Sequence, residues 1–239
     1  MINSRLGPVL RYNLEYVAWS CLYVFGISAA IMLIANFGRV VIPENIYVEG
    51  SFFNFAAIGV VLYFILGIAG VREDLRFLLQ HGMGRKTTFY GNLFCSLIAG
   101  IVLALFCMIV ELAARNWAGF PAAGSIFPYH GFFVGWLSHI ASFFFAWQFG
   151  IILSLIYYRL NKIQQIAFSV VGIAIIMALS AFGIRSLVVN IADFEEAIRR
   201  LVDNPPEIMM PAVLVLGGLG IVAAFGNYLL LRRAQVREG

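Results

Sequence analysis

The chain alternates between long apolar runs and short polar connections. Six runs are each close to the ~20 residues that a helix needs to cross the hydrocarbon core of a bilayer. Because a backbone in lipid must satisfy its own hydrogen bonds, each run is predicted to be a helix. The pattern predicts an all-α membrane protein, a single transmembrane domain over residues 1–239 with six transmembrane helices. The predicted spans are 16–38, 52–71, 89–112, 132–158, 164–184 and 209–231.

Two polar segments carry apolar residues at helical spacing. In residues 3–15, Leu6, Val9, Leu10 and Leu14 form one stripe, which predicts an N-terminal interfacial helix on the inner membrane surface. In residues 185–208, an apolar stripe from Leu187 to Leu201 is flanked by charged side chains. This second segment predicts an extracellular amphipathic helix before the sixth span.

The segment between the second and third runs predicts a short cytoplasmic helix. Its first turns carry mixed charge, its later turns an apolar patch, and two glycines and two cations follow. An amphipathic helix of this kind suits docking into a groove on a cytoplasmic partner, or lies on the lipid headgroups, and the residues alone do not decide between the two. They are Arg72, Glu73, Asp74, Leu75, Arg76, Leu78 and Leu79, then Gly82 and Gly84, then Arg85 and Lys86.

Composition supports a lipid environment and sets the orientation. Hydrophobic residues make up 62% of the chain and charged residues only 12%, against about 25% in soluble domains. With six spans both termini share one side, and eleven of the 16 Lys and Arg residues fall there. By the positive-inside rule that side is cytoplasmic. The sequence pI near 9.1 reflects this asymmetry, so we expect no nucleic-acid partner.

Residues that would carry chemistry are sparse. The three histidines are not at metal-ligand spacing, and no Gly-Lys dipeptide occurs, so the chain has no Walker A loop. We therefore expect no metal site, no catalytic residues and no cofactor bound by this chain. Three polar residues within the runs, Glu111, His139 and Gln148, either line a pathway or bond neighbouring helices.

A stretch that begins in the segment between the second and third apolar runs resembles a known family. An apolar helix is followed by a glycine turn, two cations and an aromatic-Gly-Asn-Leu start to the next run. This pattern resembles the permease subunits of ABC-2 type exporters, in particular the small bacterial ones, although Met83 and Gly84 stand where that family often has an apolar residue followed by Ser or Thr. The matching residues are Leu78, Leu79, Gly82, Arg85, Lys86, Phe89, Gly91, Asn92 and Leu93.

The resemblance implies a function and partners. Such a subunit lies in the bacterial plasma membrane and pairs with a second permease subunit, either a copy or a relative. A separate ABC ATP-binding subunit holds ATP and Mg²⁺ and contacts the helix after the second span, so residues 72–76, Leu78 and Leu79 would form the coupling surface. Arg85 and Lys86 would anchor the turn at anionic lipid. The expected cargo is amphipathic: a peptide, a drug or a lipid-like molecule. The alternatives are a membrane scaffold or sensor partner and, less favoured, an intramembrane enzyme.

Overall fold

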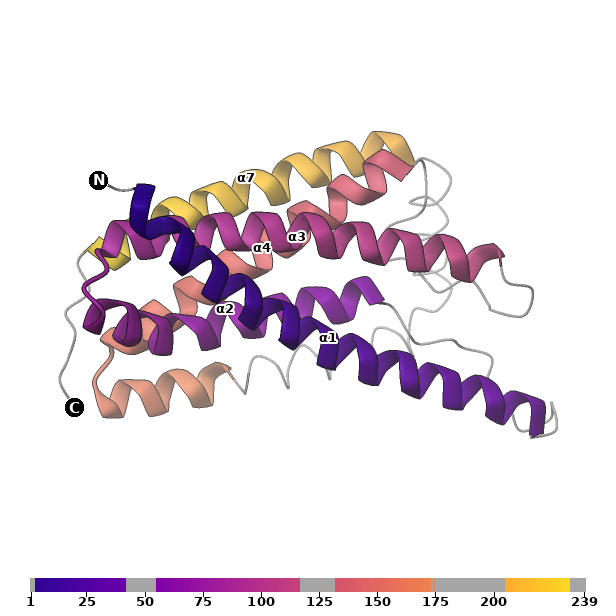
Figure 1. Cartoon of the computed structure of the whole chain (residues 1–239), viewed down its shortest axis with the longest axis horizontal. Coiled ribbons are helices and arrows are strands. Elements are labelled where there is room, and N and C mark those ends of the chain that lie inside the picture. Colours follow the sequence, from indigo (N-terminus) through magenta and orange to yellow (C-terminus); the bar gives the residue numbers. More distant parts are fainter. Residues whose placement is uncertain (1–2, 42–54, 117–131, 173, 175–204, 233–239) are drawn as a thin grey trace.

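The computed structural model of the chain describes residues 3–41, 55–116, 132–172, 174 and 205–232. Within these ranges the secondary structure is helical, with no strand, which confirms the all-α prediction (Figure 1). A further helical segment covers residues 162–172. The principal helices are α1 (Asn3–Val41), α2 (Phe55–Gln80), α3 (Arg85–Asn116), α4 (Phe132–Arg159) and α7 (Pro205–Arg232).

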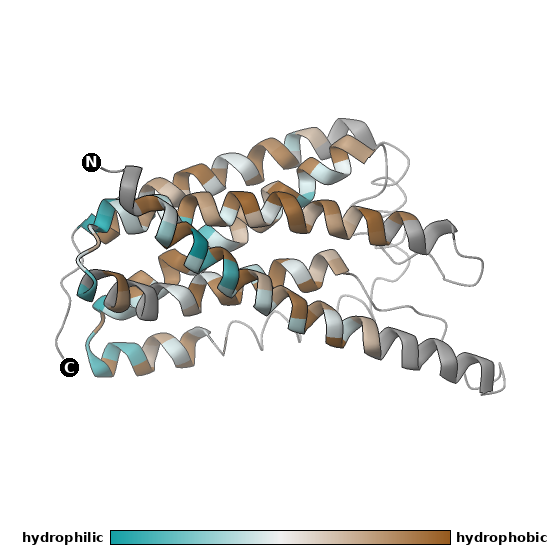
Figure 2. Ribbon diagram, in the orientation of Figure 1, coloured by the Kyte–Doolittle hydropathy of each residue, from teal (hydrophilic) through white to brown (hydrophobic). Residues whose placement is uncertain are grey.

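Three helical stretches in the described part of the chain are long and apolar enough to cross a membrane. They are Arg85–Val110, Phe132–Arg159 and Val213–Arg232, and a shorter apolar stretch covers Phe55–Gly70. Apolar residues run along most of the bundle, and polar residues gather at one end (Figure 2). Many large apolar side chains point outward, as Leu214 does at 73% exposed. Apolar surface of this kind is stable in lipid, so these helices indicate a membrane protein.

The helices alternate in direction. α1 and α3 run one way along the bundle, and α2, α4 and α7 run the other way (Figure 1). As a result α1 and α3 begin, and α2, α4 and α7 end, at the same end of the molecule. We call it the basic end, because exposed cations lie there in the described structure: Arg85, Lys86, Arg159, Lys162 and Arg232.

Helix α4 lies at the centre of the bundle and packs most extensively against α2 and α7. Small residues on α4 permit this, since they let helix backbones approach closely. At Gly150 an added Cβ would lie 2.5 Å from the Phe64 carbonyl oxygen of α2, and at Gly67 it would overlap the Trp147 carbonyl oxygen of α4. On the other side of α4, Phe144 fills the space above Gly220 of α7, where a Cβ would be 2.7 Å from the ring.

The N-terminal residues do not form a separate interfacial helix. They are helical as predicted, but they continue into the first predicted span as part of α1. Val9 is 1% exposed, and its Cγ1 would be 2.6 Å from a Cβ on Gly91 of α3. Pro8 lies inside α1, in its second turn, and removes one N–H from the hydrogen-bond ladder of the helix. The apolar stripe therefore packs on α3 at this point.

The segment after the second predicted span is not a separate helix either. Residues 72–79 extend α2 without a break as far as Gln80. The helix then ends in a Schellman turn: Gly82 has φ of 71°, and the Met83 N–H donates to the Leu78 carbonyl at 2.9 Å. α3 begins at Arg85. We call residues 77–88 the α2–α3 corner.

Some predictions lie outside the described residues. The extracellular helix expected within 185–208 is described only from Pro205, where α7 begins. The fifth span, expected over 164–184, is described as helix only over its first part.

Candidate functional site

A buried hydrogen-bond network joins three helices near the basic end. Gln148 of α4 and Asn227 of α7 are 1% and 2% exposed. The Asn227 amide nitrogen donates at 2.9 Å to both the backbone oxygen and the side-chain Oε1 of Gln148. Gln148 Nε2 in turn donates to Ser96 Oγ of α3 at 3.2 Å, and the Ser96 hydroxyl donates to the Leu93 carbonyl at 2.9 Å. Polar groups bonded across helices are expected to hold a membrane bundle in register.

A small cavity lies beside this network. It measures about 20 Å³, and the residues that line it include Asn92, Gln148 and Asn227 together with the apolar Leu155 and Leu231. Asn227 Oδ1 is buried and has no hydrogen-bond partner in the protein. The site therefore combines a polar wall with one unsatisfied acceptor.

A second amide pair joins α1 to α3. Asn13 is buried at 4% exposed, and its Nδ2 donates to Asn92 Oδ1 at 2.7 Å. The pair lies one helical turn beyond the contact of Val9 with Gly91. The start of α3 is thus held to α1 by both an apolar and a polar contact.

Two arginines bond the C-terminal end of α7. Arg85, the first residue of α3, donates to the Arg232 carbonyl at 3.1 Å. Arg159, the last residue of α4, donates to the Leu230 carbonyl at 2.6 Å. The last carbonyls of a helix lack intrahelical partners and carry partial negative charge, so cations are favoured there. Arg85, expected from the sequence to touch lipid headgroups, contacts protein in this structure.

The α2–α3 corner has a buried side and an exposed side. Leu78 is 3% exposed and belongs to the core, whereas Phe77 is 43% exposed. The Phe77 ring lies between two others, with centroids 5.4 Å from Tyr12 of α1 and 4.2 Å from His81. The exposed residues available to a partner therefore include Phe77. Among the predicted coupling residues, only Leu78 has a described side chain; the side chains of Arg72, Glu73, Asp74, Leu75, Arg76 and Leu79 lie outside the description.

His139, another polar residue expected within the spans, lies apart from Gln148. His139 is 2% exposed, and its ring is stacked on Phe143 with centroids 6.1 Å apart. Nine residues separate it from Gln148 on α4, about 13 Å along the helix. The side chain of Glu111 lies outside the described residues.

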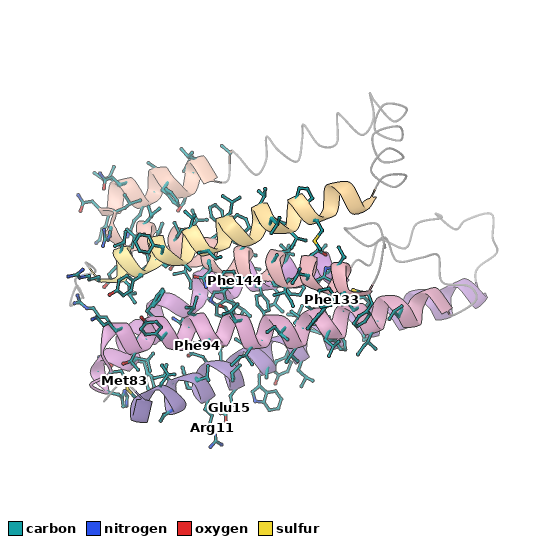
Figure 3. All side chains as sticks on the ribbon, turned by 90° about the horizontal axis from the view of Figure 1, so that it is seen from above. Arg11, Glu15, Met83, Phe94, Phe133 and Phe144 are labelled. Carbon is teal, nitrogen blue, oxygen red and sulfur yellow. The ribbon has the colours of Figure 1, made fainter. Side chains whose placement is uncertain are left out.

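The exposed surface of α1 carries one ion pair. Arg11 Nε lies 2.9 Å from Glu15 Oε1, and both side chains point away from the bundle (Figure 3). The hydrogen bond with Glu15 raises the pKa of Arg11. Because exposed pairs of this kind contribute little to stability, we assign this pair no role in the site.

No cluster of three or more His, Cys, Asp or Glu residues that could hold a metal occurs among the described side chains. Cys21, Cys95 and Cys107 form no disulfide; Cys95 and Cys107 are buried and Cys21 is half-buried. Sequence reasoning missed Asn227, although an amide within an otherwise apolar run is itself a signal of a helix-to-helix bond. It also missed the pairing of Asn13 with Asn92.

No known protein family, curated protein or solved structure matches this chain. Its function is therefore inferred from its own residues and contacts.

Proposed function

We propose that this chain is the membrane-spanning subunit of an ATP-driven exporter of the ABC-2 type. A separate ABC ATP-binding subunit binds ATP and Mg²⁺, and a second permease subunit, a copy or a relative, completes the pore. The chain crosses the bacterial plasma membrane six times with both termini in the cytoplasm, and the cargo is an amphipathic peptide, drug or lipid-like molecule. The proposal rests on the motif that begins at Leu78 and on the contacts made by the α2–α3 corner.

The observation that carries the proposal is how the α2–α3 corner is connected. The corner bonds α7 through Arg85. Just beyond the corner, α3 bonds α1 through Asn92 and packs against Val9 of α1 at Gly91. A force applied at the corner would therefore reach α1, α3 and α7 together. A permease driven by a separate ATPase requires such a connection, because motion of the motor must bias two arrangements of the spans.

The charge at the basic end supports the orientation. Exposed cations at the starts and ends of several helices meet there, including Lys86 and Lys162. Cytoplasmic connections are enriched in such residues, and a cytoplasmic basic end brings the corner within reach of a soluble ATPase.

Co-purification tests the proposal. The chain is co-expressed in cells with any ATP-binding protein encoded beside its gene and purified in mild detergent, and the ATPase that remains bound is measured. Arg76→Glu reverses a charge on the predicted coupling surface, and Lys162→Glu makes the same reversal at a position of the basic end that is exposed. We expect Arg76→Glu to lose most of the bound ATPase and Lys162→Glu to keep it, with both variants as thermally stable as the parent.

Two results would contradict the proposal. If no ATP-binding protein is retained by the parent chain, the chain is not the permease of such a pair. If an ATP-binding protein is retained but its hydrolysis is unchanged by reconstitution with the chain, a scaffold or sensor role is favoured.

A further inference from the structure

The hydrogen bonds near the basic end form two series that stop on either side of the same cavity. On one side, Asn13 donates to Asn92 Oδ1, and Asn92 lines the cavity. On the other side, Asn227 lines the cavity and donates to Gln148, which donates to Ser96. The donors follow one order in each series: Asn13 donates to Asn92 in the first, and Asn227 donates to Gln148, which donates to Ser96, in the second.

The orientation of the Asn227 amide is set by its partners. Asn227 places its nitrogen between two oxygens of Gln148, so a flipped amide would bring three oxygens together. Its Oδ1 must therefore face elsewhere, and it is buried without a partner in the protein. Asn92 Oδ1 accepts from Asn13, and we assign the Asn92 amide N–H as the group that faces the cavity.

We propose that the cavity between α3, α4 and α7 is a binding site for one structural water molecule. The water accepts from the Asn92 amide and donates to Asn227 Oδ1. It thereby joins the two series into one chain of donors from Asn13 to the Leu93 carbonyl.

The size and chemistry of the cavity fit this occupant. Its volume of about 20 Å³ exceeds the roughly 10–15 Å³ that one water needs, and buried waters bond otherwise unsatisfied polar groups. Donors that all point the same way also polarise one another and strengthen each bond.

The assigned water joins the side chains of Asn92 and Asn227 directly, in addition to the bond that Arg85 of α3 donates to the Arg232 carbonyl of α7. Gln148 bonds Asn227 from α4, and Asn13 bonds Asn92 from α1, so without the water the two pairs are separate. This inference is independent of the proposed transport function, since it concerns the resting protein alone.

Radiolytic labelling tests the proposal on the purified full-length chain in detergent micelles. An X-ray pulse converts a bound water into a hydroxyl radical in place, and in H₂¹⁸O the nearest side chain acquires ¹⁸O that mass spectrometry can locate. Two leucines provide a matched comparison: Leu155 lines the cavity and is 2% exposed, whereas Leu66 is 4% exposed in the core away from it. We expect Leu155 to be labelled several-fold more than Leu66.

A variant tests which residue holds the water. Asn227→Leu removes the acceptor and fills the space, so labelling at Leu155 should fall to the level of Leu66. Equal labelling of the two leucines in the parent chain would overturn the site, and that comparison requires no variant to fold. Strong labelling of Leu155 that persists in Asn227→Leu would show water in the cavity that Asn227 does not bind, which overturns the assignment as well.

Discussion

Gly67 of α2 and Gly150 of α4 lie against each other's helices, each opposite a backbone carbonyl of its partner. A Cβ at Gly150 would come within 2.5 Å of the Phe64 oxygen, and a Cβ at Gly67 would overlap the Trp147 oxygen. Since backbone atoms cannot turn aside as a side chain can, the two helices would have to separate to admit even a methyl group. The central contact of the bundle thus depends on the absence of side chains at two positions.

Substitution of Gly150 tests this contact. We expect Gly150→Ala to lower the free energy of unfolding by about 1–3 kcal/mol, the usual cost of overpacking a core. Gly217→Ala on α7 is the matched control, because nothing lies within 4 Å of a Cβ there, and it should be neutral or slightly stabilising. Thermal unfolding in detergent measures both, and equal stability of the two variants would contradict the tight contact.

Removal of the amide network tests its contribution to stability. Gln148→Leu or Asn227→Leu leaves a partner unsatisfied, which costs about 1–3 kcal/mol. The loss in free energy of unfolding of the double variant should be smaller than the sum of the two single losses by roughly 0.5–2 kcal/mol. The second substitution removes the amide that the first one leaves unsatisfied. Ser142→Ala is the control, since Ser142 bonds only within its own helix, to the Ser138 carbonyl. Strict additivity would mean that Gln148 and Asn227 do not interact.

Arg85 and Arg159, which donate to carbonyls at the end of α7, should stabilise its last turn against local unfolding. We expect Arg85→Gln or Arg159→Gln to cost a few tenths to about 1 kcal/mol locally, the scale of a cation at a helix C-terminus. Hydrogen–deuterium exchange should therefore speed up at the amides of the last turn of α7. Lys162→Gln removes an exposed cation from the same end and should leave the exchange rate of α7 unchanged. If Lys162→Gln speeds up exchange as much as the arginine variants do, the effect comes from the net positive charge of this end and not from the two hydrogen bonds.

Leu78 and Phe77 should respond differently to the same substitution. Leu78→Asp places a carboxylate in the core and should abolish accumulation of folded protein. Phe77→Asp loses only ring stacking at a surface, so the protein should still fold. Size-exclusion chromatography of each variant separates these outcomes. If the folded protein survives Leu78→Asp, the buried side of the α2–α3 corner is assigned incorrectly.

Membrane orientation can be checked with single cysteines in a Cys21→Ala background, in which Cys95 and Cys107 are buried. His81→Cys and Lys162→Cys lie at the basic end and should react with a membrane-impermeant maleimide only after the cells are opened. Phe133→Cys lies at the opposite end, as the positions of Phe133 and Met83 in Figure 3 show, and should react in intact cells. Labelling of His81→Cys from outside would reverse the proposed orientation.

The lengths of the apolar runs predicted the positions of the described helices well, but they predicted the junctions between helices poorly. The fourth run, predicted over 132–158, is α4 from Phe132 to Arg159, because a long apolar helix is recognised by length alone. The predicted break after residue 71 is absent, since a change from apolar to charged residues alters the surroundings of a helix without interrupting its backbone. The glycine at position 82 does end it.

The polar site was harder to predict, because helices that are apolar all round give no sign of which faces meet. Gln148 was noticed as a polar residue in a span, but its partner Asn227 is 79 residues away. Asn13 and Asn92 are equally distant in sequence. Only packing brings such pairs together, and the glycines that determine the packing are common in membrane helices.

The unbroken course of α2 determines how it can move. The helix extends 13 residues past Gly67 to Gln80 and 12 residues back to Phe55, or about 20 Å and 18 Å at 1.5 Å per residue. No break in the helix occurs between these ends, so a push at the Gln80 end would tilt the whole helix about Gly67. The Phe55 end would then move by nearly the same distance in the opposite direction, and α2 would act as a lever of almost equal arms between the basic end and the opposite end of the bundle.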